Sequence, residues 1–179
     1  MRSMDTRSSS WGNDIGFGSP PANEIICGSA AVFKILLMND GGLDLIRSDN
    51  KCSILPTDKE HVLLAAGGQN ALTASLGTLL ERGDKLGTDP LTYPGVKTAA
   101  KLLGIHLIPI QHNDYEMTEE GIRYAIQNEK IKGIYVIQDY HNPTSHIMSL
   151  ETRKMIAGLA REKNILVIED GINNLLAEN

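Results

Sequence analysis

Two adjacent glycines, Gly67 and Gly68, stand between an apolar run and a stretch of helical periodicity that begins at Gln69. Backbone N–H groups of residues 68–70 can point toward an anion there, because the positive end of the helix dipole lies at the same place. The turn has neither the GxGxxG spacing of a dinucleotide-binding loop nor the lysine of a P-loop, so ATP and NAD are disfavoured as ligands. A tight strand-to-helix turn without a ligand is an equally good interpretation of these residues alone.

Two more polar side chains follow apolar runs of strand length. Tyr93 stands before Pro94, which restricts its backbone to extended conformations, and its flat ring can stack on a planar ligand. Ordinary packing is the commoner role of a single tyrosine. Asp170 ends a run that should be buried, so its carboxylate needs a partner. A cationic ring nitrogen would be one; an arginine elsewhere, or the N-terminus of a helix over residues 172–179, would be others.

The segment YHNPTS, residues 140–145, separates an apolar run from a clear helix start. Pro143 holds Asn142 in extended backbone, where its amide can end a turn or donate to a ligand. His141 and His146 straddle this turn, and no carboxylate has the spacing to complete a metal site with them. Nucleophilic catalysis is not indicated either, since the sequence has no Ser/His/Asp or Cys/His set in a suitable context and no GxSxG motif. The other histidines are expected in solvent or at strand ends: His61, His106 and His112.

From residue 61 onward, apolar runs of strand length alternate with stretches of helical periodicity. Strands that are apolar throughout, with a helix between each pair, predict an α/β fold: a doubly wound, mainly parallel sheet with helices on both faces. Ligands of such sheets bind at the carboxyl ends of the strands, where all four motifs are expected. The strands are predicted at 61–66, 84–89, 105–110, 133–138 and 164–170, and the helices at 69–83, 96–104, 118–130 and 149–163.

Residue types at the helix ends support these boundaries. Thr118 and Ser149 are predicted N-caps, with Glu119 and Glu120 in the first turn after one and Glu151 in the first turn after the other. Gly83, Gly104 and Gly133 are expected just after helix ends, where a left-handed residue is common.

Composition limits the class of protein. The 179 residues suit one domain, and 17 basic against 22 acidic residues, with no basic block, disfavour a nucleic-acid partner. Cys27 and Cys52 suggest neither a disulfide framework nor a zinc site, which fits a cytoplasmic location.

The apolar window 25–38 is too short to span a membrane and is expected to be a core helix. Residues 1–14 are expected to be a disordered leader without a signal peptide, and residues 15–60 have no clear assignment.

Taken in order, the segments GGQNAL, DPLTYPGV, YHNPTS followed by MSLETRKMIAGLARE, and NILVIEDG resemble the large domain of fold-type I pyridoxal 5'-phosphate (PLP)-dependent aminotransferases. Within class I/II, the resemblance is greatest to the 2-aminoadipate and kynurenine-type transaminases and to the aminotransferase-like domain of MocR/GntR regulators. It covers about residues 61–171, so residues 61–179 are expected to be a partial PLP-transferase-like large domain.

The resemblance assigns a role to each motif. It implies that Gly68 and Gln69 hold the cofactor phosphate and that Tyr93 stacks on the pyridine ring. It further implies that Asn142 hydrogen-bonds the ring hydroxyl and that Asp170 pairs with the ring nitrogen, keeping it protonated.

The resemblance also implies an activity, the transfer of an amino group between an amino acid and a 2-oxo acid, and a homodimer. In the family, the Schiff-base lysine and the arginine that binds the substrate carboxylate lie downstream of the aspartate, and no lysine of this sequence stands in a matching context. The chain alone is therefore expected to be inactive, with no catalytic residue of its own. A non-catalytic regulatory or dimerisation module with the same fold is the alternative.

Overall fold

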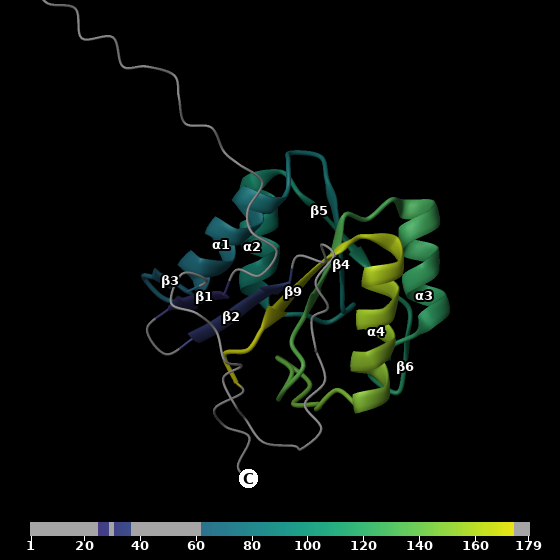
Figure 1. Ribbon diagram of the computed structural model, residues 1–179. Helices are drawn as coiled ribbons and strands as arrows, with labels where there is room; N and C mark the ends of the chain where they lie inside the picture. The colour runs from purple at the N-terminus through teal and green to yellow at the C-terminus, as the bar shows by residue number, and fades with distance from the viewer. Residues whose placement is uncertain (1–24, 29–30, 37–61, 174–179) are drawn as a thin grey trace, which may run out of the picture.

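The computed structural model describes residues 25–28, 31–36 and 62–173 (Figure 1). The predicted leader, residues 1–14, and most of the segment 15–60 lie outside the described residues. No helix of the described part is both long enough and apolar enough to cross a membrane.

Strands and helices alternate along residues 62–170, as the apolar pattern predicts, except for two short strands at residues 112–113 and 116–117 that the pattern does not predict. The strands are β3 (Val62–Ala65), β4 (Lys85–Thr88), β5 (His106–Pro109), β6 (His112–Asn113), β7 (Glu116–Met117), β8 (Gly133–Val136) and β9 (Leu166–Asp170). The helices are α1 (Gly68–Leu79), α2 (Pro94–Leu103), α3 (Glu119–Tyr124) with its π-helical continuation η2 (Ala125–Glu129), and α4 (Leu150–Lys163).

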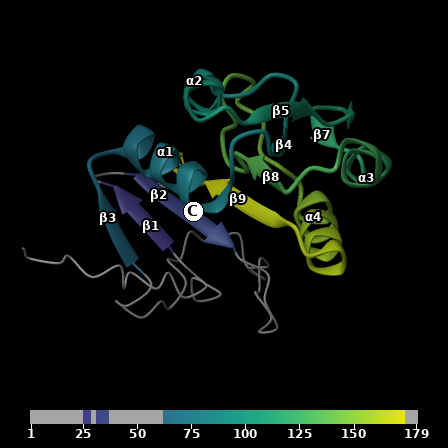
Figure 2. The same cartoon turned by 90° about the horizontal axis from the view of Figure 1, so that it is seen from above.

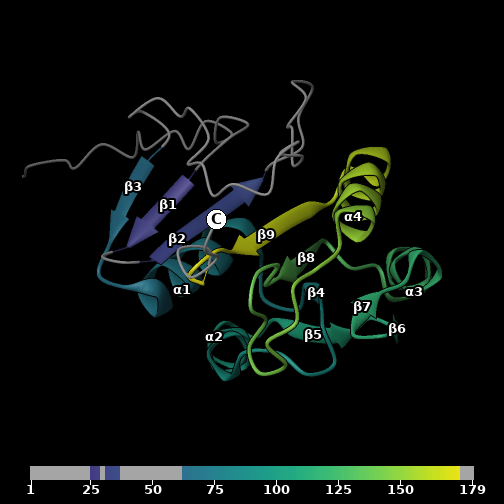
Figure 3. The ribbon, with the colours of Figure 1, turned by 90° about the horizontal axis from the view of Figure 1, so that it is seen from below.

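A seven-stranded sheet in the order β3-β1-β2-β9-β8-β4-β5 forms the centre of the fold, where β1 is Ile25–Gly28 and β2 is Ala31–Leu36 (Figure 3). The run β9-β8-β4-β5 is parallel throughout. Strand β2 is antiparallel to both of its neighbours, so β3 runs in the same direction as β9. The short strands β6 and β7 form a separate antiparallel hairpin.

Helices cover both faces of the sheet, so the predicted doubly wound α/β architecture is confirmed (Figure 2). Successive residues of a strand point to opposite faces, which divides the core in two. On β8, Tyr135 packs in the cluster formed with α1 and α2, whereas Ile134 and Val136 pack in the cluster formed with α3 and α4. The strands β8 and β9 are thus buried on both sides.

The apolar window 25–38 was expected to be a helix, and this prediction is wrong for its described residues, which form β1 and β2. A short apolar run cannot be distinguished from a buried helix by periodicity. Val, Ile and Phe favour extended backbone, and the gap between β3 and β9 supplies hydrogen-bonding partners on both sides. Tertiary pairing therefore decides the conformation here.

Three of the predicted helix-end residues are confirmed: Thr118, Ser149 and Gly104. Gly83 does not directly follow a helix, because α1 ends at Leu79 with Leu80 as its C-cap. The hydroxyls of Thr118 and Ser149 accept hydrogen bonds from the N–H of Gly121 and Thr152, and Gly104 ends α2 in the left-handed conformation. Gly133 does not follow a helix end directly but opens β8. A Cβ there would lie 2.8 Å from the Leu166 side chain, so close approach to β9 explains this glycine. Two non-glycine residues take the left-handed position after η2 and α4: Lys130 and Asn164.

Candidate functional site

The carboxyl ends of β3, β4, β8 and β9 carry all five predicted site residues. Because these strands run in the same direction, their carboxyl ends meet at one edge of the sheet. Gly68 and Gln69 begin α1 after β3, and Tyr93 immediately precedes α2 after β4. Asn142 lies in the loop after β8, and Asp170 is the last residue of β9.

The glycine turn has the geometry of an anion site. Gly67 adopts φ 100°, a conformation that favours glycine, and its carbonyl accepts the first helical hydrogen bond, from Ala71 N at 3.0 Å. The N–H groups of residues 68–70 precede that bond, so they are the end groups of the helix that an anion can satisfy. The Asn70 side chain fixes the turn by accepting a hydrogen bond from Ala66 N at 3.2 Å.

Gln69 and Tyr93 are brought together although they are distant in sequence. The Tyr93 hydroxyl donates to Gln69 Oε1 at 3.3 Å, and Gln69 Nε2 donates to the carbonyl of Gly95 at 3.1 Å. A Cβ at Gly95 would collide with both the Tyr93 ring and the Gln69 side chain, so only glycine permits this arrangement. The aromatic ring therefore lies beside the first turn of α1.

Asp170 is only 3% exposed, and its partner is a residue that the motifs did not indicate. The hydroxyl of Tyr135, on β8, donates to Asp170 Oδ2 at 2.6 Å, and Ile172 N donates to Oδ1 at 3.3 Å. Burial raises the pKa of the Asp170 carboxyl, against the opposing effect of these two hydrogen bonds. Burial, with the Asp170 charge beside it, raises the pKa of the Tyr135 hydroxyl, which therefore stays a donor.

Replacing Tyr135 with Phe removes one hydroxyl and leaves the ring in the core. We expect the free energy of unfolding to fall by about 1–3 kcal/mol at pH 7, because a buried carboxylate loses its donor. The loss should shrink in acid, since the Asp170 pKa is raised further without Tyr135 and a protonated carboxyl needs no donor. Urea unfolding at several pH values measures both effects. Tyr124→Phe, at a residue that is 60% exposed, is the matched control and should change little.

Asn142 is exposed and stands in the loop of residues 137–149, here called the Asn142 loop. Arg153 of α4 holds both stems of this loop, donating to Gln138 O at 3.1 Å and to Met148 O at 3.0 Å. Asn173 Nδ2 donates to Tyr140 O at 2.9 Å, which joins the loop to the segment after Asp170. The loop is thereby fixed at the same edge of the sheet as the aspartate.

Glu116 is a second residue that the motifs did not reveal. From β7, its carboxylate accepts hydrogen bonds from Ser149 N, Ser149 Oγ and Thr152 Oγ1 at the start of α4, and it lies 3.0 Å from His146 Nε2. Burial acts to raise the pKa of Glu116, but the hydrogen bonds from Thr152, Ser149 and His146 outweigh it and lower the pKa to about 2. Glu116 thus ties the hairpin to the end of the Asn142 loop.

Glu116→Gln should destabilise the chain by about 1–3 kcal/mol at pH 7, because the replacement removes a charged acceptor of several hydrogen bonds. Since the pKa of Glu116 is lowered in the fold, its contribution is complete above about pH 4.5 and is lost as the pH falls toward 2. The difference between wild type and variant should therefore narrow over that range in urea unfolding. Glu119→Gln, where the side chain is 50% exposed and pairs only at the surface, should cost less than about 0.5 kcal/mol.

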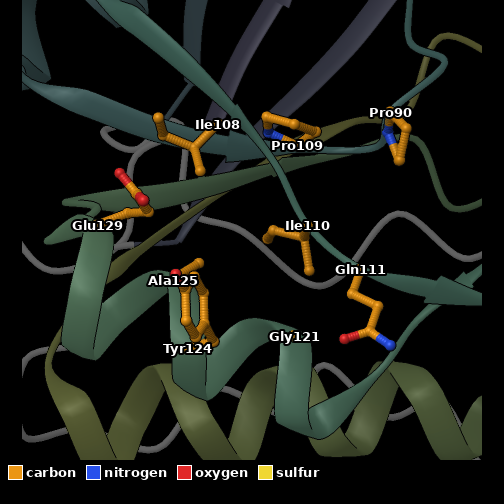
Figure 4. A pocket seen from close by; sticks show the side chains of 9 residues that line it. All are labelled: Pro90, Ile108, Pro109, Ile110, Gln111, Gly121, Tyr124, Ala125 and Glu129. Atoms are coloured by element: carbon orange, nitrogen blue, oxygen red, sulfur yellow. The ribbon is translucent and has the colours of Figure 1, made fainter.

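A hollow of about 580 Å³ lies away from these residues, between β5 and the α3–η2 segment (Figure 4). Its lining is mainly apolar and includes Ile108, Pro109 and the ring of Tyr124. None of the five predicted site residues lines it. The strand-end site is the better candidate for function, because a helix N-terminus and a buried acid are found there together.

A doubly wound sheet with a glycine turn at a helix start and a buried acid at a strand end defines a class of α/β proteins that bind ligands at the carboxyl edge of the sheet. The chain belongs to the aminotransferase class I and II family, whose sequence profile matches residues 43–173. The family is PLP-dependent. The family predicted from the four motifs is confirmed.

The matched relatives include a regulator as well as enzymes. The uncharacterized HTH-type transcriptional regulator YdeF of Bacillus subtilis is 48% identical over 123 residues, which are 69% of this chain and 27% of that protein. An archaeal alanine:glyoxylate aminotransferase is similar in structure, with a TM-score of 0.54 and 28% identity over 57% of this chain and 27% of the other. A PLP-bound C-S lyase from Staphylococcus hominis shares the fold, with a TM-score of 0.57 and 21% identity, over 63% of this chain and 30% of the other. The chain spans 27% of the length of the regulator and similar shares of the two structures.

Proposed function

We propose that this chain is the cofactor-binding part of a PLP-dependent aminotransferase domain, which transfers an amino group between an amino acid and a 2-oxo acid. The observation that carries the proposal is the arrangement of Gln69 and Tyr93 beside the open first turn of α1, on the edge of the sheet where β9 ends in the buried Asp170. An anion-binding turn, a flat ring and a buried acid match the three parts of PLP: phosphate, pyridine ring and ring nitrogen.

The chemistry of the described residues supports this proposal. The first-turn N–H groups of α1 would hold the phosphate, and Tyr93 would lie against the ring. Asp170 would hold a proton on the ring nitrogen, and Asn142 would donate to the ring hydroxyl. PLP, when bound, supplies an electron sink for bond breaking at the Cα of the amino acid. Burial raises the pKa of the Asp170 carboxyl, and a cationic ring nitrogen beside it would offset the cost of burying its charge. A shifted pKa of this kind is common among residues of functional sites.

The test is a titration of the 179-residue chain with PLP, followed by absorbance, in parallel with pyridoxal, which lacks the phosphate. We expect saturable PLP binding, at least about tenfold weaker binding of pyridoxal, and competition by inorganic phosphate. Borohydride reduction and intact mass should give no adduct at a defined lysine. Equal affinity for PLP and pyridoxal, or no saturable binding of either, would refute the proposal.

The similarity to a transcriptional regulator favours a second candidate, a non-catalytic module that binds PLP or a protein partner without turnover. An assay with several amino acids and 2-oxoglutarate distinguishes the two when it is done on the whole protein that contains this segment. Amino transfer that depends on Asp170 supports the enzyme; PLP binding without any amino transfer supports the module. In either case we expect a homodimer, which light scattering at several concentrations would show.

A further inference from the structure

A buried cluster of one carboxylate and two histidines lies beside the site and has no role in the function proposed so far. Asp89, directly after β4, is 5% exposed. His112 Nε2, from β6, lies 2.9 Å from Asp89 Oδ1, and His141 Nε2, from the Asn142 loop, lies 3.4 Å from Oδ2. Three separate segments of the chain therefore meet at one carboxylate.

The cluster is also where hydrogen bonding is least complete. Within the described residues, four buried side-chain polar atoms lack an aligned hydrogen-bond partner, and they belong to Asp89 (Oδ2), Thr92 (Oγ1), His112 (Nε2) and His141 (Nε2). The ring nitrogens of both histidines thus lie within reach of the Asp89 carboxylate without an aligned hydrogen bond. A buried polar atom without a hydrogen-bond partner lowers the stability of the fold. Residues that carry such atoms are often found at functional sites.

Asp89 is ionised in this setting. Burial acts to raise its pKa, but His112 and His141 outweigh burial and hold the pKa of the carboxyl below its usual range. His141 Nδ1 lies 2.8 Å from Thr144 Oγ1, inside the Asn142 loop. With Thr144 on one ring nitrogen, the other nitrogen of His141 is left to face the carboxylate.

The structure of the Asn142 loop indicates a role for the contact between His141 and Asp89. Arg153 holds the two stems, and Glu116 holds the end that leads into α4. At the tip, Asn142 and the proline after it are exposed, whereas His141 is 8% exposed and turns toward the sheet. His141 is thus the side chain of the tip that contacts a strand end, and it comes directly before the asparagine.

We propose that Asp89 is a positioning residue, which holds His141 and thereby fixes the amide of Asn142 at the ring end of the site, with His112 bracing the carboxylate from the β6–β7 hairpin. The cofactor part of this inference rests on the proposed function, whereas the positioning of the loop does not. Hydrogen exchange on the chain without cofactor can therefore test the positioning by itself.

The variants are Asp89→Asn, His141→Gln and the double substitution, with His106→Gln on the exposed edge strand β5 as the matched control. Hydrogen–deuterium exchange followed by mass spectrometry compares peptides from the Asn142 loop with peptides from α1. We expect each single variant to raise exchange in the loop about fivefold or more, with α1 and the control unchanged. The double variant should exchange no faster than the faster single variant, because both changes break the same contact.

The PLP affinity of the wild type and of the same four variants is the second measurement. Asp89→Asn and His141→Gln should each weaken PLP binding by about fivefold to tenfold, again without additivity. If the wild type does not bind PLP but the loop exchange responds as expected, the positioning stands and the proposed function fails. If the wild type binds PLP and neither loop exchange nor affinity changes in Asp89→Asn, the inference is overturned. Additive effects of the two substitutions on loop exchange or on PLP affinity would also overturn the inference. If Asp89→Asn does not fold, the comparison of His141→Gln with the wild type decides the test.

Discussion

Asp170→Asn is expected to weaken PLP binding by roughly 10- to 100-fold, the effect of losing about 1.5–3 kcal/mol from a charged hydrogen bond. The side chain keeps its size, so the change removes charge without opening a cavity. An amide cannot hold a proton on the ring nitrogen by charge, and the Tyr135 hydroxyl can still donate to the remaining oxygen. Absorbance titration at pH 7 measures the affinity. Asp114→Asn, at an exposed hairpin turn, is the matched control and should bind as the wild type does.

The same variant should not lose stability in the absence of cofactor. The pKa of Asp170 is raised in the fold, so the ionised carboxylate costs stability that appears as the pH rises above its usual value near 3.8. The neutral amide avoids that cost, and the free energy of unfolding at pH 7 should stay equal or increase. Weaker PLP binding together with unchanged or greater stability would mark Asp170 as a binding residue. A loss of stability that parallels the loss of affinity would instead mean that Asp170 serves the fold.

Leu72→Ala is expected to have the largest effect on stability, a loss of about 2–5 kcal/mol. Leu72 lies on α1, is fully buried, and packs in the core cluster that also contains Leu86 and Ile168 of the sheet. The replacement removes the transfer free energy of the side chain and leaves a cavity that the sheet cannot fill. Urea unfolding followed by circular dichroism gives the difference.

Leu102→Ala is the control for Leu72→Ala, because the same atoms are removed from a residue that is 71% exposed on α2. We expect it to change the free energy of unfolding by less than about 0.5 kcal/mol. Similar losses for the two variants would mean that α1 is not docked on the sheet in solution. The glycine turn at the start of α1 would then have no fixed place.

The alternation of apolar runs and helical stretches after residue 61 was enough to predict the parallel sheet and helices on both faces. Local signals also placed the N-caps Thr118 and Ser149. They failed where pairing between distant strands decides the conformation, as in β1 and β2, and where a left-handed residue is not glycine, as at Lys130 and Asn164. Sequence periodicity carries no information on which strands become neighbours.

The residues of the candidate site also fall into those that local sequence indicates and those that it does not. Asp170 ends its strand, and Gly68, Gln69, Tyr93 and Asn142 lie in the turn, loop or helix start that comes next along the chain, so a local motif indicates each of them. Tyr135, Glu116 and Asp89 hold their partners across 35, 33 and 52 positions of the chain, in the contacts with Asp170, Ser149 and His141. No short pattern encodes such a pair. The sequence therefore predicted the residues proposed to touch the ligand, and it did not predict those that hold them in place.

Strands β1 and β2 carry no predicted site residue, yet they stand between β3, which leads into the glycine turn, and β9, which ends in Asp170 (Figure 3). Neighbouring strands lie about 4.8 Å apart, so three spacings place β3 and β9 about 14 Å from each other across the sheet. One strand more or fewer would change that width by about 5 Å, whereas a hydrogen bond tolerates a few tenths of an ångström. Strands β1 and β2 thus act as a spacer that sets the distance between the two ends of the proposed site, and the size of ligand that such a site could accept depends on strand count as much as on side chains.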